Sequence, residues 1–206
     1  MNHTIDKPDY LKAFKHILRN KSALSCMIVA SLISVSFLSP IYAISFFTLF
    51  FKESLTMGAT FYSLASAMGI LGVLVGGRLI NRIGRKSLAV VACVIQGVFT
   101  TLIVFMPNSF ASAVMWMMSA FFGSATFVGF TSLVLEQVPD FRGTMISLNT
   151  SFQYIGYIVG LTISGLILNL CSNSFQILYI IFGLCGIVSA VLIVLFTRDP
   201  CKNQPS

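Results

Sequence analysis

Charged side chains are scarce in this chain: only 9% of its residues are Asp, Glu, Lys or Arg, whereas 56% are hydrophobic. A soluble domain of ordinary composition carries about 25% charged residues, which cover its surface. The charged residues here are too few to cover the surface of a soluble domain, and the mean hydropathy is +0.91. The composition therefore excludes an ordinary soluble domain and predicts a protein whose solvent is the lipid bilayer.

Ionisable residues are also missing from the middle of every long apolar segment. Both histidines, His3 and His16, lie in the polar leader, so a serine–histidine pair inside the membrane would have no base. The five cysteines lack the paired spacing of a metal or redox site. We therefore expect no enzyme activity, no metal and no cofactor. The net charge of +7 lies at segment ends, so we expect no nucleic-acid partner.

Six apolar segments are each long enough to cross a hydrocarbon layer, which requires about 20 helical residues. Short connections that contain turn formers or charges separate them. The sequence therefore predicts an all-α membrane protein with six transmembrane helices. Their expected bounds are 23–50, 57–80, 87–105, 110–135, 144–170 and 175–196.

The basic residues predict the orientation, because cytoplasmic flanks attract Lys and Arg. Six spans put both termini on one side, and that side holds all but one of the 13 Lys and Arg residues; Lys52 lies opposite. We therefore expect a transmembrane domain over 23–196 in the plasma membrane. The leader 1–22 and the tail 197–206 would then lie in the cytoplasm.

The leader has an apolar face of its own. Leu11, Phe14, Ile17 and Leu18 would share one side of a helix. This pattern favours an interfacial amphipathic helix before the first span. An ordinary basic flank is the alternative.

Small and amide side chains share one face of the fifth span, at steps of three or four residues. The face consists of Asn149, Gln153, Gly156, Gly160 and Ser164. Its carboxamides can hydrogen-bond to a solute or to a neighbouring helix, and its glycines allow close packing. The sequence leaves solute binding and packing open as alternatives.

The second span has a similar small face, for which helix packing is favoured. It contains Gly69, Gly72 and Gly76, together with Tyr62 and Ala65. The third and sixth spans carry little polarity beyond Gln96. We expect these two spans to be peripheral.

The first and fourth spans are candidate walls of a solute cavity. Ser34 and Tyr42 share a face of the first span near Pro40, which bends a helix. Trp116 and Phe127 lie with small residues on one face of the fourth span, a mixture that suits a moderately apolar ligand. The alternative is an aromatic stripe that faces lipid or another helix.

The connection after the second span, residues 77–86, reads Gly-Arg-Leu-Ile-Asn-Arg-Ile-Gly-Arg-Lys. It resembles the signature loop of the major facilitator superfamily, G-x-L-x-D-R-x-G-R-[RK], in pattern and in position between two spans. The matching residues are Gly77, Leu79, Arg82, Gly84, Arg85 and Lys86. Asn81 replaces the usual Asp, which keeps a capping oxygen for a helix start but removes the negative charge.

Pro139, Arg142 and Gly143 precede the fifth span and are similar to the connection between the tenth and eleventh helices of such transporters, notably drug and sugar efflux members. The resemblance corresponds to the C-terminal half of the twelve-helix fold. It implies two inverted three-helix repeats. Spans one and four would line the cavity, spans two and five would face the other half, and the basic loop would act at the cytoplasmic gate.

We therefore expect transport of a small solute by alternating access, with efflux as one direction. The expected partners are the lipid bilayer, the solute and a second six-helix half, either a separate chain or a second copy. Since the spans lack ionisable groups, proton coupling would reside on the partner half. The alternative is a non-transporting membrane protein, either an assembly or regulatory subunit or a truncated remnant of a transporter.

Overall fold

The computed structural model describes residues 14, 16, 17, 19–170 and 174–197. Within these residues all regular elements are helical, and six spans are long and apolar enough to cross a membrane. The predicted fold class and number of spans are thus confirmed. The helices are α2 (Lys21–Ser36), α3 (Ser39–Leu49), α4 (Leu55–Ile83), α5 (Arg85–Leu102), α6 (Ser109–Leu135), α7 (Arg142–Leu170) and α8 (Phe175–Phe196), with the 3-10 turns η1 (Ile103–Phe105) and η2 (Pro139–Phe141).

The predicted leader helix lies largely outside the described residues, as does the tail from residue 198 onward. Two members of its apolar face are described. Ile17 is fully buried in the core of the bundle, whereas Phe14 is exposed.

The first span is interrupted where α2 meets α3. α2 ends at Ser36, and α3 begins at Ser39 with Pro40 in its first turn. Proline has no backbone N–H and its ring clashes with the preceding helical turn, so the helix breaks before it. This interruption agrees with the bend that Pro40 predicts, and it places Phe37 between two helical segments.

The connection between α4 and α5 is shorter than expected. α4 continues through Asn81 to Ile83, and Gly84 alone separates it from Arg85 at the start of α5. Gly84 has a φ of +83°, a conformation that glycine adopts without steric cost. The expectation that Asn81 caps a helix start is wrong, because the helix runs past the polar residues that were interpreted as a loop.

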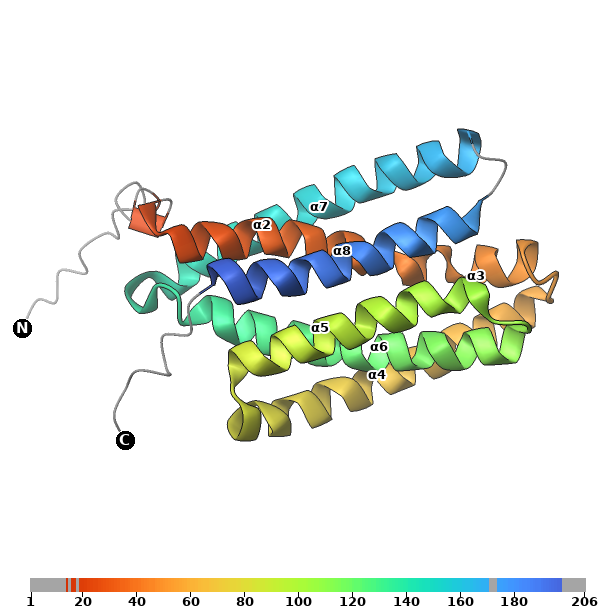
Figure 1. The fold of residues 1–206 in the computed structure, drawn as a ribbon, viewed down its shortest axis with the longest axis horizontal. Helices are drawn as coiled ribbons and strands as arrows, with labels where there is room; N and C mark the ends of the chain where they lie inside the picture. The colour runs from red at the N-terminus through yellow and green to blue at the C-terminus, as the bar shows by residue number, and fades with distance from the viewer. Residues whose placement is uncertain (1–13, 15, 18, 171–173, 198–206) are drawn as a thin grey trace, which may run out of the picture.

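The helices pack in a symmetric pattern. α2 packs against α7 and α8, whereas α6 packs against α4 and α5, and α5 packs against α8. The first helix of each three-helix unit is therefore seated against the second and third helices of the other unit. Figure 1 shows this arrangement, with α7 and α4 on opposite sides of the other helices. This pattern fits two three-helix repeats related by a two-fold axis.

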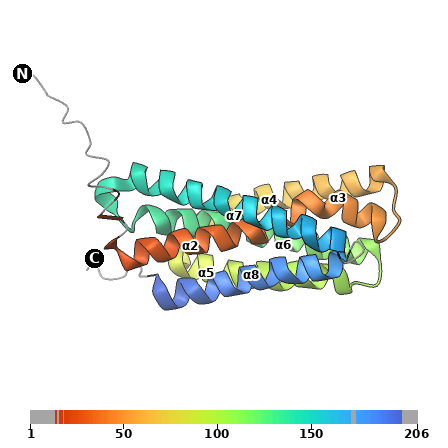
Figure 2. The same ribbon diagram turned by 90° about the horizontal axis from the view of Figure 1, so that it is seen from above.

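The spans differ in burial within the bundle. In the most apolar stretches of α4 and α7 only 17% of residues are buried, against 44% or 50% in the other spans. Figure 2 shows α5 and α8 toward one side and α7 toward the other. The third and sixth spans, which we expect to be peripheral, are among the more buried within the bundle. These helices, α5 and α8, approach closely: a Cβ at Gly97 would lie 2.6 Å from the carbonyl oxygen of Gly183.

The buried apolar side chains form two clusters. One lies toward the end where α2 begins and α8 ends, which we call the terminal end; it includes Met27, Met145 and Ile193. The other lies toward the opposite end and includes Phe46 and Tyr179.

Candidate functional site

A cavity of about 460 Å³ lies in the middle of the bundle. Its walls come from α4, α5, α6 and α7 and from the break between α2 and α3. Gly69, Gln96 and Gly123, which line it, lie near the midpoints of α4, α5 and α6. The volume lies within the range of about 300–1,000 Å³ that is usual for small-molecule sites.

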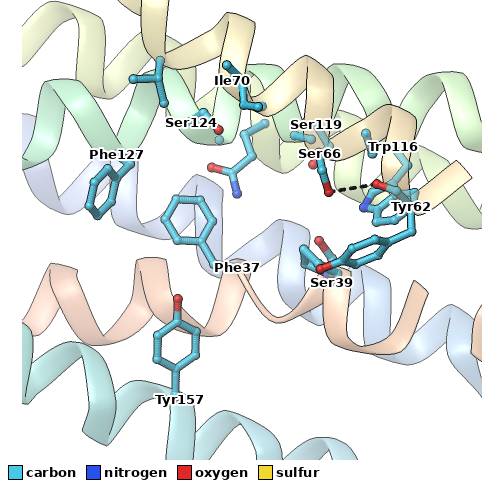
Figure 3. A pocket seen from close by; sticks show the side chains of 17 residues that line it. Phe37, Ser39, Tyr62, Ser66, Ile70, Trp116, Ser119, Ser124, Phe127 and Tyr157 are labelled. Carbon is cyan, nitrogen blue, oxygen red and sulfur yellow. Dashed lines mark hydrogen bonds between the residues drawn. The ribbon is translucent and has the colours of Figure 1, made fainter. Parts of the chain in front are cut away.

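Aromatic rings form much of the cavity wall. Trp116 on α6 and Tyr62 on α4 are in contact, with their ring centroids 5.8 Å apart. Figure 3 shows Phe127 at the opposite end of the cavity from these two rings, and Phe37 and Tyr157 on its lower side. Such walls bind flat or apolar groups through burial and ring contacts.

The polar part of the wall is neutral. Among the described lining residues there are Ser, Tyr, Trp and Gln side chains, but no Asp, Glu, Lys, Arg or His. The hydroxyl of Ser66 donates to the carbonyl oxygen of Tyr62 at 2.9 Å, the bond drawn in Figure 3. The hydroxyls of Ser119 and Thr100 bond to each other at 2.7 Å.

Gln96 is one of several lining residues that the sequence did not indicate as cavity residues. Its carboxamide is buried, with Nε2 donating to the hydroxyl of Ser36 at 3.3 Å. Its Oε1 has no hydrogen-bond partner among the described residues. The sequence signal for this residue is a single amide in a span with little other polarity, a span that we expect to be peripheral.

Two of the six predicted cavity residues line the cavity in the structure. Trp116 and Phe127 line the cavity, whereas the other predicted residues, Ser34, Tyr42, Asn149 and Gln153, are not among the residues that line it. Helical periodicity placed them on shared faces, but those faces turn toward other helices.

Each of these four side chains has a different environment. The Ser34 hydroxyl donates to the Ala30 carbonyl of its own helix at 2.8 Å. Tyr42 packs against the ring of Phe182. Asn149 is buried, and its Oδ1 has no hydrogen-bond partner within the described residues. Gln153 is half-buried on α7.

The predicted packing glycines lie at two close helix contacts. A Cβ at Gly72 on α4 would lie 2.1 Å from the carbonyl oxygen of Phe121 on α6. A Cβ at Gly156 on α7 would lie 2.2 Å from the carbonyl oxygen of Ser31 on α2. The same two contacts include Gly69, Gly76 and Gly160. A larger side chain at these contacts would push the helices apart.

An ionic cluster lies at the terminal end. The Glu136 carboxylate, at the end of α6, lies 3.1 Å from Nη1 of Arg85 and 3.3 Å from Nη2 of Arg142. Lys86 Nζ donates to the carbonyl oxygens of Val194 at 3.0 Å and Thr197 at 2.6 Å. These contacts connect the ends of α5, α6, α7 and α8.

The other residues predicted for the two connections differ in exposure. Gly84 is half-buried at the turn. A Cβ at Gly77 or Gly143 would meet nothing within 4 Å. The exposed members of the set are Gly77, Asn81, Arg82, Pro139, Arg142 and Gly143.

Comparison with known proteins identifies the family. A family model described as Major Facilitator Superfamily matches residues 24–206, and a search of curated proteins gave no match. The match covers five of the six described spans in full and all but the first three residues of the first span. The chain therefore belongs to the Major Facilitator Superfamily and is a multi-pass membrane protein of a transporter family.

Proposed function

We propose that this chain moves a small solute across the membrane by alternating access, as one six-helix half of a transporter. The observation that carries the proposal is the cavity, which is closed on one side and open on the other. Its floor, with Trp116 and Ser119, is buried. Its rim is exposed, and Ile70 on the rim is 64% exposed.

The chemistry of the cavity supports the presence of a second bundle. Hydroxyl and amide groups that faced acyl chains would lose the hydrogen bonds that water provides. A second six-helix bundle over the open side would cover them and enclose a solute between the two halves. The weakly buried helices α4 and α7 flank this side and would form the contact surface.

The terminal-end contacts support movement of the bundle as a unit. Lys86 and Glu136 link the ends of four helices, and the glycine contacts hold α4 on α6 and α7 on α2. A bundle braced in this way can rock against its partner without changing its own packing. The basic residues of the connections would then meet the partner bundle when the terminal-end gate closes.

The absence of ionisable groups from the described cavity lining bears on energy coupling. A proton relay inside a membrane is usually built from carboxylates or histidines. We therefore place any proton coupling on the other half. If this chain alone showed robust proton-driven uptake in vesicles, that assignment would be wrong.

The test is transport in reconstituted vesicles. The chain is incorporated alone, at high density that favours self-association, and together with a candidate N-terminal half. Uptake and efflux of a panel of uncharged compounds are measured in each case. Transport that requires a second bundle supports the proposal. Stable assembly with the second half but no transport of any compound would instead favour the alternative, a non-transporting subunit.

A further inference from the structure

Gln96 is a buried amide whose hydrogen-bonding capacity is only partly used. The residue is 2% exposed and lines the cavity, and its Oε1 has no partner in the described part of the chain. Buried polar atoms are almost always hydrogen-bonded, and an unpaired acceptor is costly. An unpaired oxygen on the wall of a ligand-sized cavity is available to accept a hydrogen bond from a ligand.

The position of the Gln96 carboxamide is fixed by its neighbours. Nε2 donates to the Ser36 hydroxyl, which leaves the carbonyl oxygen as the unused atom. A Cβ at Gly123 would lie 3.3 Å from Cδ of Gln96 and 3.2 Å from the ring of Phe37. The glycine therefore provides the space in which the amide and this ring lie side by side.

The nearby hydroxyls do not provide the missing donor. Ser66 already donates to the backbone of its own helix, and Ser119 and Thr100 are paired with each other. A hydroxyl has a single donor hydrogen. None of these bonds reaches Oε1 of Gln96, which stays an acceptor without a donor among the described residues.

We propose that the cavity binds an uncharged molecule that carries a flat ring and a hydroxyl or N–H group, and that this group donates to Oε1 of Gln96. The inference rests on the proposed function, because it names the solute class of the same cavity. The ring contacts Trp116 and Phe127, as the aromatic wall requires. A charged molecule is rejected, because no described lining residue provides an opposite charge.

The chain contains a built-in reporter of this binding. Its one Trp is Trp116, which lines the cavity, so quenching of intrinsic fluorescence reports an aromatic ligand beside that ring. Three probes share a nitrophenyl ring. 4-Nitrobenzyl alcohol has a donor, its methyl ether has none, and 4-nitrobenzoate carries a negative charge.

The expected result concerns each probe in the wild-type chain and in Gln96→Leu. The alcohol should quench Trp116 saturably, and its dissociation constant should rise about tenfold in Gln96→Leu, since a hydrogen bond to a buried acceptor is lost. The ether should bind equally to both proteins. The benzoate should show no saturable quenching.

Two further variants make the test specific. Gln153→Leu removes an amide from α7 outside the cavity and should leave the affinity for the alcohol unchanged. Gln96→Asn keeps the amide but shortens it by one methylene. It should weaken alcohol binding, and it replaces the leucine variant if that variant fails to fold by circular dichroism.

Several results would overturn the inference: no saturable quenching by the alcohol, equal affinity for the alcohol in the wild type and both Gln96 variants, or benzoate binding as tight as that of the alcohol. Binding as expected in a chain that assembles with a second bundle but transports no compound would leave the inference standing and refute the proposed function. Transport of compounds that lack any donor, at rates unaffected by Gln96→Leu, would refute the inference and leave the proposed function standing.

Discussion

Nζ of Lys86, at the start of α5, lies 2.6 Å from the carbonyl oxygen of Thr197, the residue that caps the end of α8. The last carbonyl groups of a helix have no partners within it and carry a partial negative charge. Lys86 therefore satisfies two such carbonyls and joins the two three-helix units at the terminal end.

The first prediction concerns this cap. Lys86→Met should lower the free energy of unfolding in detergent by about 1 kcal/mol, since it leaves the helix end without its cation. Chemical unfolding followed by circular dichroism measures the change. Arg82→Gln is the control, because Arg82 is exposed and makes no hydrogen bond or ion pair within the described residues. An equally large loss of unfolding free energy in Arg82→Gln would indicate a general effect of charge removal and not the loss of this cap.

The second prediction concerns Glu136. Glu136→Gln should lower stability by about 1–2 kcal/mol, because it weakens two ion pairs that are only partly screened by water. Asp140→Asn, which removes an exposed carboxylate from the same connection, should change it by less than about 0.5 kcal/mol. A double-mutant cycle between Glu136 and Arg142 should give a coupling of about 0.5 kcal/mol, since Arg142 is exposed. A coupling of zero would show that this pair contributes nothing to stability.

The third prediction compares two glycines of α4. Gly72→Ala should destabilise the bundle by about 1–3 kcal/mol, because the new methyl would collide with the α6 backbone at Phe121. Gly77→Ala adds the same methyl where nothing lies within 4 Å. It should be neutral or stabilising by up to about 1 kcal/mol, because alanine favours a helix. If both variants unfolded alike, the described α4–α6 contact would be incorrect.

The fourth prediction concerns the turn between α4 and α5. Gly84 has φ +83° and ψ 158°, a combination that is essentially restricted to glycine. Gly84→Ala should cost about 1–3 kcal/mol through backbone strain alone, because no atom lies within 4 Å of the added Cβ. Gly143→Ala, also in open space but within α7, is the matched control and should not destabilise the chain. Thermal unfolding of both variants in one detergent provides the comparison.

The sequence predicted the six spans well because long apolar runs depend on composition, which can be read directly. The predicted bounds of the connections between the spans were less accurate. α4 and α7 extend into segments that contain Asn81 and Arg142, since a helix that leaves the hydrocarbon layer can continue in water with polar side chains. In α4 the polar residues indicate where the helix leaves the hydrocarbon layer, whereas Gly84, with its positive φ, is where the helix ends.

The cavity was predictable only in part. Trp116 and Phe127 stand out as aromatic residues among small ones on one face of a helix, and both line it. Gln96 did not stand out, because it shares its side of α5 with small residues such as Ala92 and Cys93, a pattern that is typical of helix packing. Asn149 was assigned to the cavity because its face has amides and glycines, but those glycines seat α7 against α2.

Photo-crosslinking in intact membranes tests the central claim, that a second bundle covers the α4 and α7 side. A benzophenone amino acid is introduced at Ile158 on α7, which is 65% exposed, and for comparison at Val191 on α8, which is also exposed. We expect position 158 to form adducts with a six-helix bundle, either a second copy or another membrane chain whose presence restores transport. Position 191 should form few such adducts. Lipid adducts alone at both positions would contradict it.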